Sequence, residues 1–176
     1  MNIGSIMIQK TARNTNFNVG DSVVYPSHGV GVITSEEVQS VAGTEVNLYV
    51  ISFEKDKMIL RVPKSRASKA GLRHLSSDDE IEAVVKILQS KAKLTKGMWS
   101  KRAQEYEMKI NSGSIVAIAE VLRDLHRNVE DPERSYSEKV IYDLALDRLV
   151  NEYSVATKLD RAESHNKILS ILNYTR

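Results

Sequence analysis

The hydrophobic pattern of this 176-residue chain changes its period once, and the change limits which folds the chain can adopt. Up to residue 65, apolar residues form short runs rich in Val, Ile, Tyr and Phe, which are typical of β-strands. From residue 77 onwards, they recur at i, i+3, i+4 and i+7, the spacing of a one-sided helical stripe. Strands followed by helices, without alternation between them, predict a segregated α+β fold.

Turn residues divide the first part into expected strands at 23–25, 30–41, 46–53 and 58–62. Gly29 and Gly43 lie at turns, where a residue that tolerates positive φ is favoured. Pro63 ends the last strand because it has no N–H to donate to a neighbouring strand. We therefore expect a small antiparallel sheet, strongly bent or closed into a partly open, barrel-like domain of about four or five strands.

Alternation along the last strand decides where Arg61 points. Met58 and Val62 share one face of the strand, so their burial turns Arg61 outward. An ordinary surface arginine, paired across the sheet with Glu45 or Glu54, would account for this position. The pattern alone therefore gives Arg61 no special role.

The second part predicts a compact bundle of five amphipathic helices, because each apolar stripe is too narrow to be buried without its neighbours. Ser77–Glu80 and Ser135–Glu138 are capping boxes that open two of these helices. Another helix begins at Trp99 or Ser100. The expected organisation is a mobile leader at 1–16, a sheet domain at 17–65, a linker at 66–76 and a helical domain at 77–176.

Composition excludes several classes of protein. The chain has no cysteine, so disulfides, thiolate metal sites and cysteine nucleophiles are ruled out. No apolar run approaches the ~18 residues that a membrane span requires, and the start lacks an apolar segment followed by a small-residue cleavage site. We therefore expect a cytoplasmic protein without a membrane partner.

Catalytic patterns are absent from the sequence. No nucleophile elbow or phosphate-binding loop occurs, and the carboxylates lie in capping boxes and on helix faces. The histidines are far apart and outside metal-binding patterns, so turn or surface positions are expected for His28, His74, His126 and His165. We predict no enzymatic activity, metal, cofactor or small-molecule ligand. A nucleic-acid hydrolase is the enzyme alternative, but no residue set can be nominated for it.

A basic tract contains the chain's only tryptophan. Residues 86–102 carry six basic side chains, no acidic one, and Trp99. Positive charge beside a large apolar ring suits a nucleic-acid backbone and its base stack. The residues that would hold phosphates, without reading base sequence, are Lys93, Lys96, Lys101 and Arg102. Two other interpretations stay open: the tract is a solvated surface, and Trp99 anchors the helical core.

Four segments carry a resemblance to a known family: Val19–Val32, Leu60–Pro63, Trp99–Arg102 and Ala119–Leu125. In this order they are similar to segments of the CarD/CdnL family of bacterial transcription regulators, and the similarity runs from about Phe17 to the C-terminus. The resemblance implies a Tudor-like domain that binds the β subunit of RNA polymerase. It also implies a helical domain that contacts promoter DNA at the upstream edge of the transcription bubble.

The resemblance also implies roles for particular residues. Arg61 would contact the polymerase, and Gln39 stands where the family has a second basic contact. Trp99 matches the family's tryptophan wedge, and Lys101 and Arg102 match the basic residues that follow it. The implied function is stabilisation of the open promoter complex by a non-enzymatic regulator, which would reach the nucleoid through the polymerase. A module that binds RNA or another protein, with the helices as a dimerisation scaffold, is the alternative.

Overall fold

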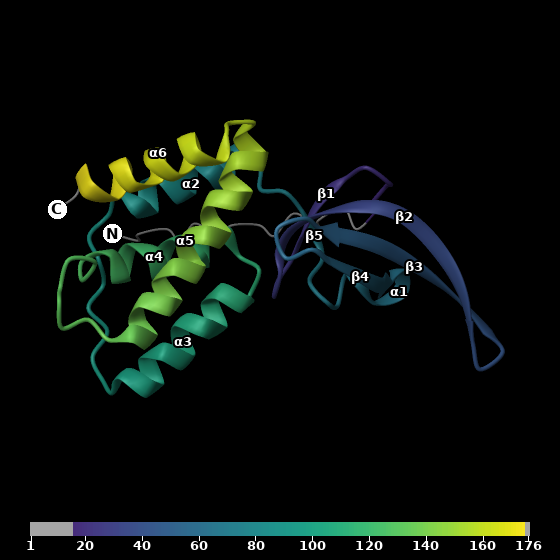
Figure 1. The fold of residues 1–176 in the computed structure, drawn as a ribbon, viewed down its shortest axis with the longest axis horizontal. Coiled ribbons are helices and arrows are strands. Elements are labelled where there is room, and N and C mark those ends of the chain that lie inside the picture. Colours follow the sequence, from purple (N-terminus) through teal and green to yellow (C-terminus); the bar gives the residue numbers. More distant parts are fainter. Residues whose placement is uncertain (1–15, 175–176) are drawn as a thin grey trace, which may run out of the picture.

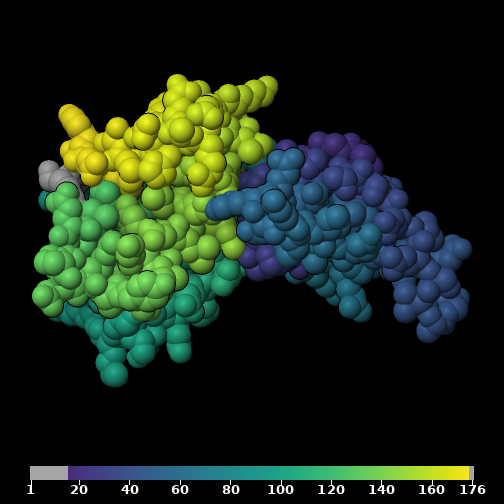
Figure 2. Space-filling model, viewed as in Figure 1, coloured from purple at the N-terminus to yellow at the C-terminus, as the bar shows by residue number. Residues whose placement is uncertain are grey.

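The computed structural model describes residues 16–174, so the mobile leader expected at residues 1–16 lies outside the described residues except for Asn16. The strands and the helices form two parts that lie side by side along the longest axis (Figure 1). Figure 2 shows these parts in contact, with the hairpin of the second and third strands extending away from the helices. Within the described residues, no helix is both long and apolar enough to cross a membrane.

Five antiparallel strands form one sheet in the order β4-β3-β2-β1-β5. Their bounds are β1 Ser22–Tyr25, β2 Gly29–Val41, β3 Thr44–Phe53, β4 Met58–Pro63 and β5 Arg73–His74. The first four lie almost at the bounds predicted from the sequence. The barrel-like closure is not confirmed, because the sheet is not closed: its two edges are β4 and the 2-residue β5, which pairs with β1.

Local backbone geometry shapes the long β2–β3 hairpin. Gly29 and Gly43 have φ values of 79° and 80°, which confirms the positive φ predicted at these turns. A register shift between Ile33 and Ser35 marks a β-bulge, which bends β2 where it pairs with β3. The hairpin therefore curves rather than lying flat.

The described residues contain six helices, not the five expected. Their bounds are α1 Lys64–Ala67, α2 Asp78–Leu88, α3 Trp99–Asn111, α4 Ile115–His126, α5 Tyr136–Thr157 and α6 Arg161–Tyr174. The additional helix, α1, is a single turn that follows Pro63 and packs against β3 and β4. Because α1 has only 4 residues, it is too short for an apolar period to reveal it.

One face of the sheet carries an apolar core that α1 helps to cover. Its buried members are Phe17, Val23, Ile33, Tyr49, Ile51, Phe53, Val62, Ala67 and Leu72. Met58 and Leu60 pack against this cluster, as the alternation in β4 predicted. The opposite face of β4 is therefore directed away from this core.

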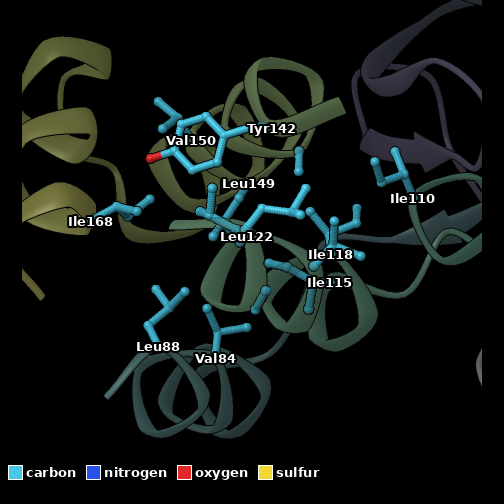
Figure 3. Packing of buried hydrophobic residues seen from close by; sticks show 14 of the residues in the cluster. Val84, Leu88, Ile110, Ile115, Ile118, Leu122, Tyr142, Leu149, Val150 and Ile168 are labelled. Carbon is cyan, nitrogen blue, oxygen red and sulfur yellow. The ribbon is translucent and has the colours of Figure 1, made fainter. Parts of the chain in front are cut away.

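The helical part has its own core, in which the apolar stripes of the helices meet (Figure 3). Four of the helices each contribute a side chain that is 0% exposed: Val84 of α2, Leu122 of α4, Leu149 of α5 and Ile168 of α6. The capping box of α2 is confirmed, since Ser77 Oγ accepts from Glu80 N at 3.3 Å and Glu80 Oε2 accepts from Ser77 N at 2.9 Å.

His126 lies in this core, so the turn or surface position expected for it is wrong. The residue is 5% exposed. Its Nδ1 lies 2.8 Å from Tyr142 Oη, and its Nε2 lies 2.9 Å from Asn173 Oδ1. Burial is tolerated because both ring nitrogens have polar partners.

A buried ion pair joins the two parts. Arg73 of β5 donates to both carboxylate oxygens of Glu152 in α5, at 2.6 and 2.9 Å, and the two side chains are 8% and 4% exposed. Glu152 also accepts from Ser76 N at 3.1 Å and Ser76 Oγ at 2.7 Å. Arg73 Nε donates to the carbonyl of Gly113 at 2.7 Å. Arg73 and Ser76 belong to residues 66–76, the segment expected as a linker.

A second set of contacts closes the same junction. Arg148 of α5 donates to the carbonyls of Pro26 at 3.2 Å and Ser27 at 2.6 Å, in the turn between β1 and β2. Burial lowers the pKa of Arg148, and the nearby charges of Asp147 and Asp56 act against that shift. These contacts fix the end of the sheet against the middle of α5.

Candidate interaction surfaces

Arg61 forms an ion pair that reaches across strand β3. Its Nε donates to Glu37 Oε2 at 2.9 Å, and its Nη2 donates to Glu37 Oε1 at 3.4 Å. Gln39 Nε2 donates to the same carboxylate at 3.4 Å. The structure therefore brings Arg61 and Gln39 together through Glu37. The acidic partner is Glu37 on β2, in place of Glu45 or Glu54.

This Arg61–Glu37–Gln39 cluster lies on the sheet face opposite the apolar core. Arg61 pairs in register with Val50 on β3, so both side chains share a face. Val50 is 5% exposed although it lies outside the core cluster, which fits cover by the ion pair above it. Ile59, two residues before Arg61, is 60% exposed on the same face. The outer face of the sheet thus presents charge beside exposed apolar surface at the edge strand β4.

The ion pair shifts the pKa of both partners. The hydrogen bond from Arg61 lowers the pKa of Glu37 below its ordinary value of 4.5, helped by the charge of Arg61 and the hydrogen bond from Gln39. The hydrogen bond to Glu37 raises the pKa of Arg61. Both groups are therefore charged at neutral pH.

Trp99 is the first residue of α3, and its ring is partly buried against the helical core. The ring centroid lies 6.3 Å from that of Tyr106, at an interplanar angle of 45°. The indole N–H donates to Ser137 Oγ at the start of α5, at 3.3 Å. Trp99 is thus neither sealed inside the bundle nor fully exposed. Its surroundings fit in part an anchor of the helical core and in part a ring that is open to a partner.

Arg102 lies beside Trp99 rather than pointing straight into solvent. Its guanidinium carbon is 5.5 Å from the Trp99 ring centroid and 6.0 Å from that of Tyr106. Its Nε and Nη2 atoms are buried and have no hydrogen-bond partner among the described residues. The arginine therefore shares the aromatic surroundings of Trp99.

The rest of the basic tract is accessible. Its lysines are exposed at Lys93, Lys96 and Lys101. Two large apolar side chains of the same segment are also exposed, Leu94 at 73% and Met98 at 77%. Charge and apolar surface therefore occur together beside Trp99.

Helix α4 contacts the middle of this tract. Asp124 Oδ1 accepts from the backbone N–H of Lys93 at 2.8 Å and from Arg123 Nε at 2.8 Å. Arg123 Nη1 in turn donates to Ser90 Oγ at 2.9 Å. Asp124 and Arg123 are buried, so the loop that carries the lysines is fixed to the helical core.

The two candidate surfaces lie at different ends of the molecule. The C-terminal end of α3 adjoins the junction, where Gly113 meets Pro26 and accepts from Arg73. Trp99 lies at the other end of this 13-residue helix. A helix of that length spans about 20 Å, so the tryptophan is well separated from the sheet.

Two family models match consecutive parts of the chain. The "CarD-like/TRCF RID domain" matches residues 17–76, and the "CarD, C-terminal domain" matches residues 83–169. The protein named "Putative transcription factor YdeB", from Bacillus subtilis (strain 168), is 30% identical over 139 residues, which are 79% of this chain and 91% of that relative. This chain belongs to the CarD/CdnL family.

A solved structure is also similar to part of this CarD-like chain. The "Solution NMR structure of the 72-residue N-terminal domain of Myxococcus xanthus CarD" is 33% identical to it. The match covers 34% of this chain and 80% of that chain, with a TM-score of 0.29.

Family membership makes this CarD-like chain a transcription-related factor. Residues 17–76 form a domain of the RNA polymerase-interacting class. Factors of this family are generally not enzymes. Within residues 16–174, no group of three or more His, Asp or Glu side chains is placed to hold a metal ion.

Several residues that shape these surfaces were not found from the sequence. Glu37, Asp124 and Ser137 are ordinary polar residues whose partners lie far along the chain. The buried Arg73–Glu152 pair joins residues 79 positions apart. No local pattern signals such pairs, although Arg123 and Asp124 do fall within a segment that resembles the family.

Proposed function

We propose that this CarD-like chain binds the β subunit of RNA polymerase through the outer face of its sheet and stabilises the open promoter complex through Trp99. The observation that carries the proposal is the position of Trp99. The ring lies at the start of α3, partly exposed, beside exposed lysines and Met98, at the end of the helix farthest from the sheet.

The polymerase contact would centre on Arg61 and Gln39. A carboxylate of the polymerase could approach the guanidinium, which has donors to share with a second acceptor beside Glu37. The exposed Ile59 would add apolar contact at the same edge. Gln39 can contribute a hydrogen bond but no charge, so Arg61 would supply the electrostatic part.

The DNA contact would act on an already opened junction. Unstacking a base step costs a few kcal/mol, which makes it difficult for one tryptophan to melt an intact duplex. At the upstream edge of a bubble the stack is already broken, so an indole can fill the gap and oppose reannealing. A preference of ~1.4 kcal/mol for the open state raises its population about tenfold relative to the closed state.

The lysines would hold phosphates and give register without sequence specificity. Lys93, Lys96 and Lys101 are exposed for this role, whereas Arg102, the fourth basic residue named from the sequence, lies against the ring of Trp99. DNA binding by the protein alone should be weak and sensitive to salt. Docking on the polymerase would raise the local concentration of the tract near the promoter, so tight contacts with DNA are not required.

The test uses two variants that separate the two surfaces. Trp99→Ala should bind purified RNA polymerase as the wild type does, but should lose the gain in open-complex lifetime. Arg61→Glu should lose both polymerase binding and that gain, because it replaces the guanidinium that would meet a polymerase carboxylate with a second acid beside Glu37. The double variant Glu37→Arg with Arg61→Glu restores the internal ion pair and serves as a folding control.

Three outcomes contradict the proposal. An undiminished open-complex lifetime with Trp99→Ala would exclude the tryptophan contact. Undiminished polymerase capture by Arg61→Glu would exclude the docking face. If the wild-type protein captures no polymerase subunit, a module that binds RNA or another protein becomes the better interpretation.

A further inference from the structure

Three side chains from two helices surround the indole of Trp99. Ser137 of α5 accepts its N–H, Arg102 stacks its guanidinium 5.5 Å from the ring, and Tyr106 lies behind it. On α3, residues 99, 102 and 106 are spaced at i, i+3 and i+7, which places them on one side of the helix. The ring is therefore restrained by contacts with both α3 and α5.

Arg102 faces these rings with most of its donors turned inward. Nε and Nη2 are buried without a partner among residues 16–174, and the guanidinium carbon also lies 6.0 Å from the Tyr106 ring. A phosphate-binding arginine would instead offer its fork of donors to an incoming oxygen. The neighbouring Lys101 is exposed and has the access that a phosphate contact requires.

We propose that Arg102 and Ser137 are positioning residues that hold the indole of Trp99 in the pose that meets DNA, and that Arg102 is not a phosphate contact. This inference rests on the proposed function, because it assigns the indole to DNA. A planar guanidinium stacks on an aromatic face in a way that a lysine ammonium cannot reproduce. Ser137 fixes the rotation of the ring through its N–H.

Holding the ring in advance has a direct consequence for binding. A side chain that is already ordered loses less conformational freedom when its partner arrives. The N–H edge is occupied by Ser137, so the ring would meet the bases through its apolar surface rather than through a hydrogen bond. This form of contact suits a wedge that does not read sequence.

The single tryptophan provides a site-specific signal for the first test. In the full-length protein, Arg102→Met and Ser137→Ala should shift Trp99 emission to longer wavelength and increase its quenching by acrylamide. Arg102→Lys should resemble Arg102→Met, since it keeps the charge without the planar group. Ser137→Thr should restore the wild-type signal because it keeps the hydroxyl. Lys101→Met, one residue away and exposed, is the matched control and should leave both readings unchanged.

The second test separates positioning from phosphate binding. Affinity for a forked promoter duplex is measured against salt concentration for each full-length variant. Lys101→Met should lower the slope of log affinity against log salt by about 0.9, the value for one lost phosphate contact. Arg102→Met should weaken binding by a similar factor at every salt concentration and leave the slope unchanged.

Each result decides one claim. Wild-type emission and quenching in both Arg102→Met and Ser137→Ala would overturn the positioning role. A slope reduced equally by Arg102→Met and Lys101→Met would make Arg102 a phosphate contact and overturn the assignment. If Trp99→Ala and Lys101→Met both bind the fork as the wild type does, the proposed function fails, whereas the emission of Trp99 still decides whether Arg102 and Ser137 hold the ring.

Discussion

Arg61 and Arg102 have different surroundings, one acidic and one aromatic, and the difference determines what each side chain can do. Arg61 donates two hydrogen bonds to Glu37, which keeps its charge close to an opposite charge. Arg102 lies over two aromatic rings, with two buried nitrogens that have no partner among the described residues. Replacing Arg61 should therefore change the titration of a neighbouring acid, whereas replacing Arg102 should change the surroundings of a ring.

Arg61→Gln should raise the pKa of Glu37 towards its ordinary value of 4.5, because the hydrogen bond from Arg61 is the main cause of the lowered pKa. Since the folded-state pKa is lowered, the pair stabilises the protein above pH 4.5 and loses this effect as pH falls through the folded-state pKa. Carbon NMR titration of the Glu37 carboxyl measures the shift. Gln39→Ala should produce a smaller rise, and an unchanged pKa in Arg61→Gln would contradict the assignment.

At the scale of the element, hydrophobic alternation and helical spacing predicted most of the strands and helices. Elements of only a few residues could not be predicted in this way. Strands β1 to β4 and the start of α3 at Trp99 follow from alternation and helical spacing. The 2-residue β5 and the 4-residue α1 carry no period, and an open sheet cannot be distinguished from a barrel without knowing its edges.

The direction in which a charged side chain points also could not be predicted from the sequence. The composition of the basic tract indicated charge near Trp99, but the stacking of Arg102 on the rings depends on how α3 packs against α5. For the same reason His126 was expected at a turn or on the surface, although it is buried and its ring nitrogens meet polar partners on α5 and α6. The segments that resemble the family identified candidate residues but not their contacts.

Leu122→Ala tests the packing of the helices. Leu122 is 0% exposed at the centre of the helical core, so its truncation should cost about 2–5 kcal/mol of unfolding free energy. Leu144→Ala, on α5 and 37% exposed, is the matched control and should cost clearly less. Urea denaturation followed by circular dichroism gives both values. Equal losses would mean that Leu122 does not lie in the core described.

For the whole molecule, the junction decides where the two surfaces stand relative to each other. Glu152 accepts hydrogen bonds from Arg73 and Ser76, so the buried carboxylate is well satisfied. Arg73 also binds the carbonyl of Gly113, just beyond the end of α3. The helix that carries Trp99 is thus tied directly to the sheet, and polymerase docking on the sheet would set the position of the tryptophan on DNA.

Glu152→Ala should break this connection. Removing one partner of a buried ion pair typically costs about 3–5 kcal/mol, because the remaining charge is left buried. Scanning calorimetry should show one transition for the wild type, and two transitions or a large fall in Tm for the variant. Asp147→Ala removes the more exposed pairs with Lys55 and Arg161 and should cost only about 0.2–1 kcal/mol per pair. A Glu152→Ala protein with wild-type unfolding would show that the junction does not couple the parts.

The most direct test of the account is to locate residue 99 on a promoter. The full-length variant Trp99→p-benzoylphenylalanine is irradiated in open complexes with RNA polymerase, and the cross-linked base is mapped by primer extension. Tyr174→p-benzoylphenylalanine, at a position 89% exposed on α6, is the control for non-specific cross-linking. We predict cross-links from residue 99 at the upstream edge of the bubble, in open but not in closed complexes. Cross-links elsewhere on the DNA, or none while the polymerase is bound, would contradict the proposed contact.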